Sequence, residues 1–113
     1  MLALCFAHAH GAGDPARGAE LYEARCTGCH SLDANRIGPM HRRVVGRKAG
    51  SVRDYAYSPA LGKSKLTWSE ANLDRWLANP EALVPGQKMG YSVPESADRA
   101  DIIAYLRRET STP

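Results

Sequence analysis

Apolar residues recur at helical spacing in three parts of the chain, and each part carries the end signals of a helix. The first part follows Asp14, whose side chain can cap a backbone, and begins at Pro15, where a missing N–H has no cost. Gly18 and Tyr22 lie four residues apart, on one face of this segment. The pattern predicts a first helix that runs from Pro15 toward Cys26.

The other two predicted helices lie in the C-terminal half. Thr67 and Glu70 have the spacing of a capping box, which predicts a helix that begins there and ends before Pro80. The third helix begins near Ser96, with acidic residues early and Arg107 late, an order that complements the helix dipole. The predicted core residues of these two helices are Leu73, Trp76, Leu77, Ile102, Ile103, Tyr105 and Leu106.

Residues 31–66, between the first two helices, are punctuated by Gly and Pro and are predicted to form long loops. The chain of 113 residues has room for one domain, yet Leu, Ile, Val and Phe together make up only about 17% of it. Loops of this length are uncommon in a small domain unless they serve a function. Both observations predict loops that wrap a large ligand, which supplies the missing apolar volume.

Cys26, Cys29 and His30 form the pattern C-x-x-C-H, the attachment signature of a c-type haem. In helical turns these positions share one face, so two thiols can add to the vinyl groups of one porphyrin while the imidazole points at the iron. The motif predicts one covalently attached haem c. The alternatives are a thioredoxin-type dithiol and a structural zinc site. The former needs a β-α-β pattern, and the latter needs further ligands that the chain does not supply at zinc-site spacing.

Three residues are candidates for a second axial ligand to the iron. Met89 lies in a loop rich in Pro and Gly, far from His30 in the sequence. Met40 and His41 lie so close to His30 in the sequence that the chain would have to turn sharply for either to reach the opposite face of the porphyrin. The sequence alone favours Met89 and leaves the other two open.

The N-terminal segment has the features of a truncated export signal, because an apolar run ends at Ala9 in the small-x-small pattern of a cleavage site. We expect a leader over 1–12, one domain over 13–108 and a flexible tail over 109–113. No apolar run approaches the ~20 residues of a membrane-spanning helix. Since thioethers to haem form outside the cytoplasm in bacteria, we expect a periplasmic protein, or an intermembrane-space protein if the source is eukaryotic.

Basic residues are concentrated in one part of the chain. The formal net charge is only +3, but nearly all charged residues between 36 and 65 are Lys or Arg. Such a run is typical of a solvated surface. Aromatic residues are not interleaved with it and no nucleic-acid-binding motif is present, so we expect no nucleic-acid partner.

A series of further short motifs stands in a fixed order around the C-x-x-C-H pattern, over residues 14–108. They are Gly18-x-x-x-Tyr22, Gly38-Pro39, Gly46-Arg47-Lys48-x-Gly50, Tyr57, Thr67-Trp68, Leu77-x-Asn79-Pro80, Pro85-Gly86-x-Lys88-Met89 and Ile103-Ala104-Tyr105-Leu106. In this order they resemble the class I c-type cytochromes of the mitochondrial type. The resemblance implies an all-α, single-domain fold in which three main helices, short helices and long loops surround one covalent haem.

The resemblance also implies a set of iron ligands. Cys26 and Cys29 would attach the haem, and His30 and Met89 would bind the iron from opposite faces. The Pro39 carbonyl would accept a hydrogen bond from His30 Nδ1 and so fix the plane of the imidazole.

Further roles follow from the same resemblance. Arg47, Tyr57 and Trp68 would hold one haem propionate, and Ser58 would lie near the other. Gly18 would mark the point where the first and last helices cross, a place with no room for a Cβ. A buried propionate needs donors, so these assignments are physically sensible.

The chain departs from the family pattern near Met89. Trp76 stands where the family commonly has a Tyr whose hydroxyl reaches the methionine sulfur, and an indole cannot replace that hydroxyl. Leu61 and Gln87 replace the Asn and Thr that usually belong to a buried water network. We expect the axial ligation to survive and the reduction potential to shift, in a direction that the sequence does not give.

Two ligands on the iron leave no open site for a substrate, which favours electron transfer over catalysis. The resemblance implies a soluble, monomeric carrier that cycles between Fe(III) and Fe(II) and docks electrostatically between a donor of the cytochrome bc type and an oxidase or other acceptor. Arg25 and Lys88 match the family's basic ring around the haem edge. The alternative is a haem protein whose Met89 dissociates to bind a small ligand, as in a peroxidase or gas sensor.

Overall fold

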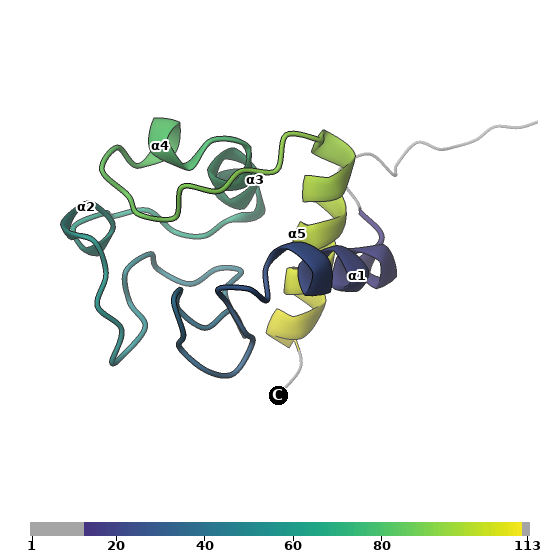
Figure 1. Cartoon of the computed structure of the whole chain (residues 1–113), viewed down its shortest axis with the longest axis horizontal. Coiled ribbons are helices and arrows are strands. Elements are labelled where there is room, and N and C mark those ends of the chain that lie inside the picture. The colour runs from purple at the N-terminus through teal and green to yellow at the C-terminus, as the bar shows by residue number, and fades with distance from the viewer. Residues whose placement is uncertain (1–12, 112–113) are drawn as a thin grey trace, which may run out of the picture.

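Helices α1 and α5, from the two ends of the chain, cross on one side of the molecule, and the remaining helices and long loops lie on the other side (Figure 1). The computed structural model describes residues 13–111. These residues form α1 (Pro15–Arg25), α2 (Pro59–Gly62), α3 (Glu70–Ala78), α4 (Pro80–Leu83) and α5 (Ser96–Ser111). The predicted leader over 1–12 and the last two residues lie outside the described part of the chain.

Helix α1 begins as the sequence predicts. The Asp14 side chain accepts hydrogen bonds from the backbone N–H groups of Ala16 and Arg17, and Pro15 occupies the first helical position. The backbone N–H of Asp14 also donates to Asp101 Oδ1 at 2.7 Å. The cap therefore fixes both the start of α1 and its attachment to α5.

The crossing of α1 and α5 depends on Gly18. A Cβ at this position would lie 1.9 Å from the backbone oxygen of Asp101, a distance that no side chain tolerates. One turn later, the rings of Tyr22 and Tyr105 pack at a centroid distance of 5.2 Å. The prediction that Gly18 marks a close helix crossing is confirmed.

The second predicted helix begins later than expected. Its N-cap is Ser69, whose hydroxyl accepts from the Asn72 N–H, and not Thr67. Thr67 instead forms an antiparallel bridge with Lys48, and the backbone around it is extended. This pairing removes Thr67 from the helix. The expected capping box of Thr67 and Glu70 is therefore wrong, and the N-cap lies two residues later, at Ser69.

The ends of the other helices also refine the predictions. Ser58 caps the short helix α2, which lies within the segment predicted as loops, and Asn79 caps the short helix α4, which directly follows α3. Helix α5 continues to Ser111, so residues 109–111 are helical and not a flexible tail. The Thr110 hydroxyl accepts from the Val45 N–H at 3.1 Å and thereby attaches the last turn to the loop region.

The core lies between α1, α3, α5 and the loops that face them. The buried side chains include Tyr22, Val44, Trp68, Leu73, Trp76, Leu77, Val93, Ile102, Ile103 and Leu106. Most of the residues predicted for the core are among them, and Tyr105 is partly buried against them. Over residues 13–111, the helices are all too short or too polar to cross a bilayer.

Candidate haem site

A cavity of about 470 Å³ opens between the α1–α5 pair and the helices and loops of the other side. Every residue that the sequence analysis assigned to the haem lines it: Cys26, Cys29, His30, Pro39, Arg47, Tyr57, Ser58, Trp68, Trp76 and Met89. The structure therefore brings together residues from the end of α1, the long loops, α3 and the loop that precedes α5.

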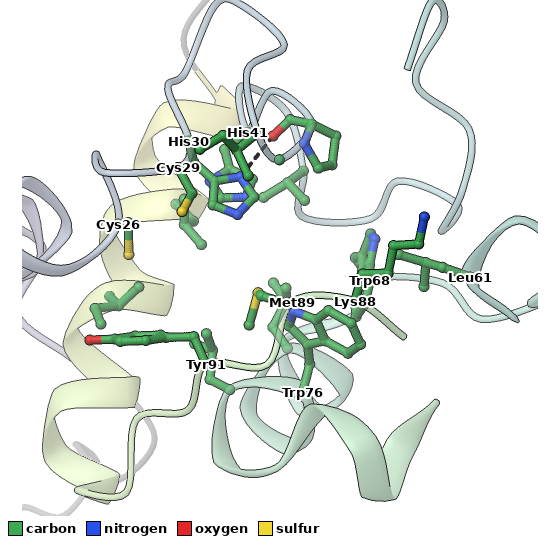
Figure 2. A pocket seen from close by; sticks show the side chains of 18 of the residues that line it. Cys26, Cys29, His30, His41, Leu61, Trp68, Trp76, Lys88, Met89 and Tyr91 are labelled. Carbon is green, nitrogen blue, oxygen red and sulfur yellow. Dashed lines mark hydrogen bonds between the residues drawn. The ribbon is translucent and has the colours of Figure 1, made fainter. Parts of the chain in front are cut away.

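His30 is held by its backbone and by its ring. Its backbone N–H donates to the Cys26 carbonyl at 2.9 Å, which keeps the C-x-x-C-H segment in a tight turn. Nδ1 donates to the Pro39 carbonyl at 3.0 Å (Figure 2). Nε2 has no hydrogen-bond partner among the described residues and borders the cavity. Burial lowers the pKa of His30, which favours the neutral imidazole that a metal needs.

The two cysteines of the motif lie on the same wall of the cavity and form no disulfide. Cys26 is partly buried, and burial raises the pKa of its thiol to about 11. Cys29 is exposed, so the cavity is open to solvent at this edge. One haem in the cavity would have two thiols on one side and an exposed edge beside Cys29.

Met89 faces His30 across the cavity, and its thioether points inward (Figure 2). Its loop is held by Gln87, whose side-chain oxygen accepts from the N–H groups of Met89 at 2.6 Å and Gly90 at 3.2 Å. Gln87 in turn donates to Glu81 at 3.0 Å. The residue that sequence analysis treated as a departure from the family pattern thus supports the Met89 backbone.

The two other candidates for the second ligand do not lie opposite His30. The His41 ring is stacked on the His30 ring, with centroids 3.9 Å apart, so the two imidazoles share one side of the cavity. Met40 lines a separate surface depression with Arg43 and Arg53. Among the described residues, Met89 is the candidate that faces His30.

Arg47 lines the polar part of the cavity, and one of its donor atoms lacks a partner among the described residues. Arg47 donates from its terminal nitrogens to the carbonyls of Met40 and Arg42, but its Nε is buried and has no hydrogen-bond partner within residues 13–111. Such a donor is costly unless an anion or a polar group completes its bonds. A haem propionate is a group of this kind.

The other residues expected at this part of the cavity are also placed there. The Tyr57 hydroxyl accepts from the Val52 N–H at 3.0 Å, which leaves its own O–H free to donate. Ser58 is buried and caps α2. Trp68 packs edge-to-face against Trp76, with centroids 5.2 Å apart, and both line the cavity on the side of Met89 (Figure 2). Two thiols, a free imidazole nitrogen, a thioether, apolar walls and an unpaired cationic donor fit a haem c.

The mouth of the cavity carries the two large hydrophobic residues that are most exposed in the described part of the chain. Ile37 is 73% exposed and Tyr91 is 41% exposed. Lys88 is also exposed and lines the cavity. Arg25 is less available than the sequence suggested, because it pairs with Asp98 at 3.3 Å and with Glu95 at 3.4 Å.

Sequence reasoning missed the structural roles of Tyr91 and His41. Tyr91 is hydrogen-bonded to Arg25, and His41 is bonded to the Tyr22 hydroxyl. Neither role has a sequence signature, because each depends on a contact between distant segments. The sequence feature that could have indicated the role of His41 is its position close to the Gly38-Pro39 turn. The sequence analysis considered His41 only as a candidate iron ligand.

Comparisons with known proteins agree with this site. The family model described as cytochrome c matches residues 15–109. The chain is 44% identical over 104 residues to cytochrome c2 of Rhodomicrobium vannielii, which covers 88% of this chain and 82% of the relative. It is 39% identical over 102 residues to cytochrome c of Arabidopsis thaliana, with 87% and 91% covered.

A solved structure shows the same relationship. Cytochrome cH from Methylobacterium extorquens superposes with a TM-score of 0.81 at 45% identity, over 85% of this chain and 99% of the other. Proteins of the family carry one covalently bound haem c and transfer electrons, and they are not enzymes. The family model, the relatives, the fold and the cavity agree, and this chain belongs to the cytochrome c family.

Proposed function

We propose that Cys26 and Cys29 attach the haem through thioethers, that His30 and Met89 are its axial ligands, and that the chain is a one-electron carrier. The observation that carries this proposal is the placement of His30 and Met89 on facing sides of one apolar cavity (Figure 2). With a side chain at each axial position, no coordination site is left for a substrate. This arrangement supports transfer of electrons and not catalysis.

The haem supplies the Fe(III)/Fe(II) couple, and the chain sets the conditions under which it works. The Pro39 carbonyl fixes the tautomer of His30 and makes the imidazole a better donor. The Met89 thioether favours the reduced iron over the oxidised iron and so raises the reduction potential. The apolar side chains of Trp68, Trp76 and Leu73 would exclude water from the haem.

Arg47, Tyr57 and Trp68 bind one propionate in this proposal, and Ser58 lies near the other. The unpaired Nε of Arg47 is the strongest support, since a carboxylate would complete its hydrogen bonds. The paired charges would keep a buried carboxylate ionised without a large desolvation cost.

Redox partners dock at the open edge beside Cys29. The exposed side chains of Ile37 and Tyr91 give this edge an apolar centre, and Lys88 adds a positive charge. Because Arg25 is already paired with Glu95 and with Asp98 of α5, the positive field at the edge is weaker than the family's ring of basic residues implies. We expect a monomer that accepts electrons from a cytochrome bc-type donor and delivers them to an oxidase or other acceptor.

The same proposal places the protein in the periplasm. Haem attachment to the two cysteines takes place outside the bacterial cytoplasm, and a bacterial cytochrome c2 is among the relatives. The location can be tested by fractionation of the native cells, followed by detection of the holoprotein in the periplasmic fraction.

An optical spectrum of the chain, co-expressed with a haem c maturation system, tests the ligation. We expect haem that stays with the denatured chain, sharp α and β bands after reduction, and the weak far-red thioether–iron band in the oxidised protein. The far-red band should disappear in Met89→Ala and remain in the matched variant Met40→Ala. Loss of the band in Met40→Ala alone, or absence of covalent haem, would contradict the proposal.

A further inference from the structure

His41 lies against His30, one of the two proposed iron ligands. It has no part in the electron transfer proposed above. Its ring is stacked on that of His30 with centroids 3.9 Å apart and planes at 22° (Figure 2). Stacking at this distance places the two imidazoles in van der Waals contact over their faces. Any rotation of the His30 ring out of its plane would therefore have to displace His41.

The hydrogen bond to Pro39 orients the His30 imidazole through one ring atom, and a second contact can restrain the plane further. The bond from His30 Nδ1 to the Pro39 carbonyl sets where the nitrogen lies, but it permits rotation of the ring about the N–H···O axis. A parallel ring in contact with the face opposes this rotation. The backbone of Gly38 also lies close, since a Cβ there would be 2.0 Å from His30 Cε1.

His41 is itself held in place by a further contact. Its Nδ1 shares a hydrogen bond of 2.9 Å with the Tyr22 hydroxyl, and the two rings meet edge-to-face with centroids 5.7 Å apart. Tyr22 is buried at the α1–α5 crossing, where it packs against Tyr105. A continuous series of ring contacts thus connects the helix crossing to the ring of His30.

We propose that His41 is a positioning residue that, together with Tyr22, fixes the plane of the His30 imidazole. The inference rests on the proposed role of His30 as an iron ligand. The orientation of an axial imidazole determines how its π orbitals overlap with those of the iron, and therefore which direction in the haem plane carries the unpaired spin of Fe(III). His41 would set this direction without contact with the iron.

The haem methyl resonances in the proton NMR spectrum of the ferric holoprotein report this direction. We expect His41→Leu to change the order or spacing of these resonances, because Leu removes the flat surface against His30. His41→Phe restores a flat ring and should retain most of the parent pattern. Tyr22→Phe, which keeps the stack and loses the hydrogen bond, should change the pattern less than His41→Leu does.

Loss of stability alone must be separated from loss of orientation. Val93→Ala is the control, because Val93 is fully buried and does not line the cavity, so this variant should be less stable in urea with an unchanged methyl pattern. His41→Leu leaves the Tyr22 hydroxyl without its partner, and the double variant Tyr22→Phe/His41→Leu removes that cost if the single variant folds poorly.

The outcomes distinguish this inference from the proposed ligation. A parent protein without the far-red band would overturn the His30/Met89 ligation and the inference with it. A parent with the band, and a methyl pattern that His41→Leu and the double variant leave unchanged, would overturn the inference alone and show that His41 only fills space. A changed pattern in His41→Leu that His41→Phe reverses supports the positioning role.

Discussion

Arg25 Nε donates a hydrogen bond of 2.8 Å to the hydroxyl of Tyr91, and its guanidinium lies over the Tyr91 ring at 5.7 Å from the centroid. Arg25 is the residue before Cys26, and Tyr91 lies two residues after Met89. Because Arg25 is also paired with Asp98 at the start of α5, it connects the loop of Met89 to both ends of the fold. This contact lies across the mouth of the cavity.

Tyr91→Phe should make release of Met89 from the iron easier. The variant keeps the aromatic ring and removes only the hydroxyl that accepts from Arg25. A partly exposed hydrogen bond to a charged group contributes about 1 kcal/mol, so we expect ferric holoprotein to bind added imidazole about three- to tenfold more tightly. The measurement is a titration of the far-red band.

A matched control is available at the same mouth. The Tyr55 hydroxyl donates to the Ile37 carbonyl, and within the described residues it forms no hydrogen bond to the Met89 loop, so Tyr55→Phe should bind imidazole as the parent does. Equal imidazole affinities for Tyr91→Phe and the parent would show that the contact does not restrain Met89.

Arg47→Gln should lower the reduction potential. The arginine carries a fixed positive charge beside the proposed propionate, and a positive charge stabilises the iron in its lower oxidation state. One unit charge at an effective dielectric constant of about 20 gives a shift on the order of 50 mV. Voltammetry of the holoprotein measures it, with Arg53→Gln as the control because Arg53 is exposed and does not line the cavity. A shift no larger than that of the control would argue against the assignment of Arg47.

Gly18→Ala should destabilise the protein strongly, because its Cβ would meet the Asp101 carbonyl at 1.9 Å and force the two helices apart. The expected loss in the free energy of unfolding is about 3 kcal/mol. Gly62→Ala, whose Cβ would meet its nearest neighbour at an ordinary 3.8 Å, should lose much less. Urea denaturation of both holoproteins tests the difference, and equal midpoints would refute the close crossing.

Asp101→Asn should remove a contribution to stability that depends on pH. The hydrogen bond from the Asp14 N–H and the ion pair with Arg17 hold the pKa of Asp101 below its ordinary value. A carboxyl group with a lowered pKa in the folded state stabilises the fold above its unfolded pKa of about 4. This stability is lost as the pH falls through the folded value.

The parent should therefore be more stable than Asp101→Asn by about 1 kcal/mol at pH 7, and the difference should shrink below about pH 4. Asp54→Asn is the control, since Asp54 is exposed and has no bonded partner among the described residues. Denaturation midpoints measured from pH 7 to pH 3 give the comparison. A difference that grows toward acid pH would reverse the sign argued here.

The parts of the fold that local chemistry determines could be predicted from the sequence. Asp14 and Pro15 specify the start of α1 by themselves, and the spacing of Cys26, Cys29 and His30 favoured a haem over a dithiol or a zinc site, with which the cavity that they line agrees. The large share of loop, with few aliphatic residues, correctly indicated that a ligand completes the core.

What the sequence could not provide depends on contacts between distant segments. Thr67 has the composition of a cap, but the backbone pairing with Lys48 extends it and moves the helix start to Glu70. The roles of His41 and Tyr91 likewise depend on partners in α1. Trp76 lines the cavity, as the sequence suggested. Its packing against Trp68 depends on how α3 lies against the loops, which the sequence does not give.

The contact between Asp14 and Asp101 joins positions that are 87 residues apart. A ribosome delivers α1 and the cysteine motif early and α5 last, so the wall that α5 forms cannot close until nearly the whole chain has been made. A closed fold without the haem would also leave an open cavity of about 470 Å³. Closure of α5 on α1 is therefore the last step that the order of synthesis permits, and in the proposed holoprotein the haem fills the volume beside this crossing.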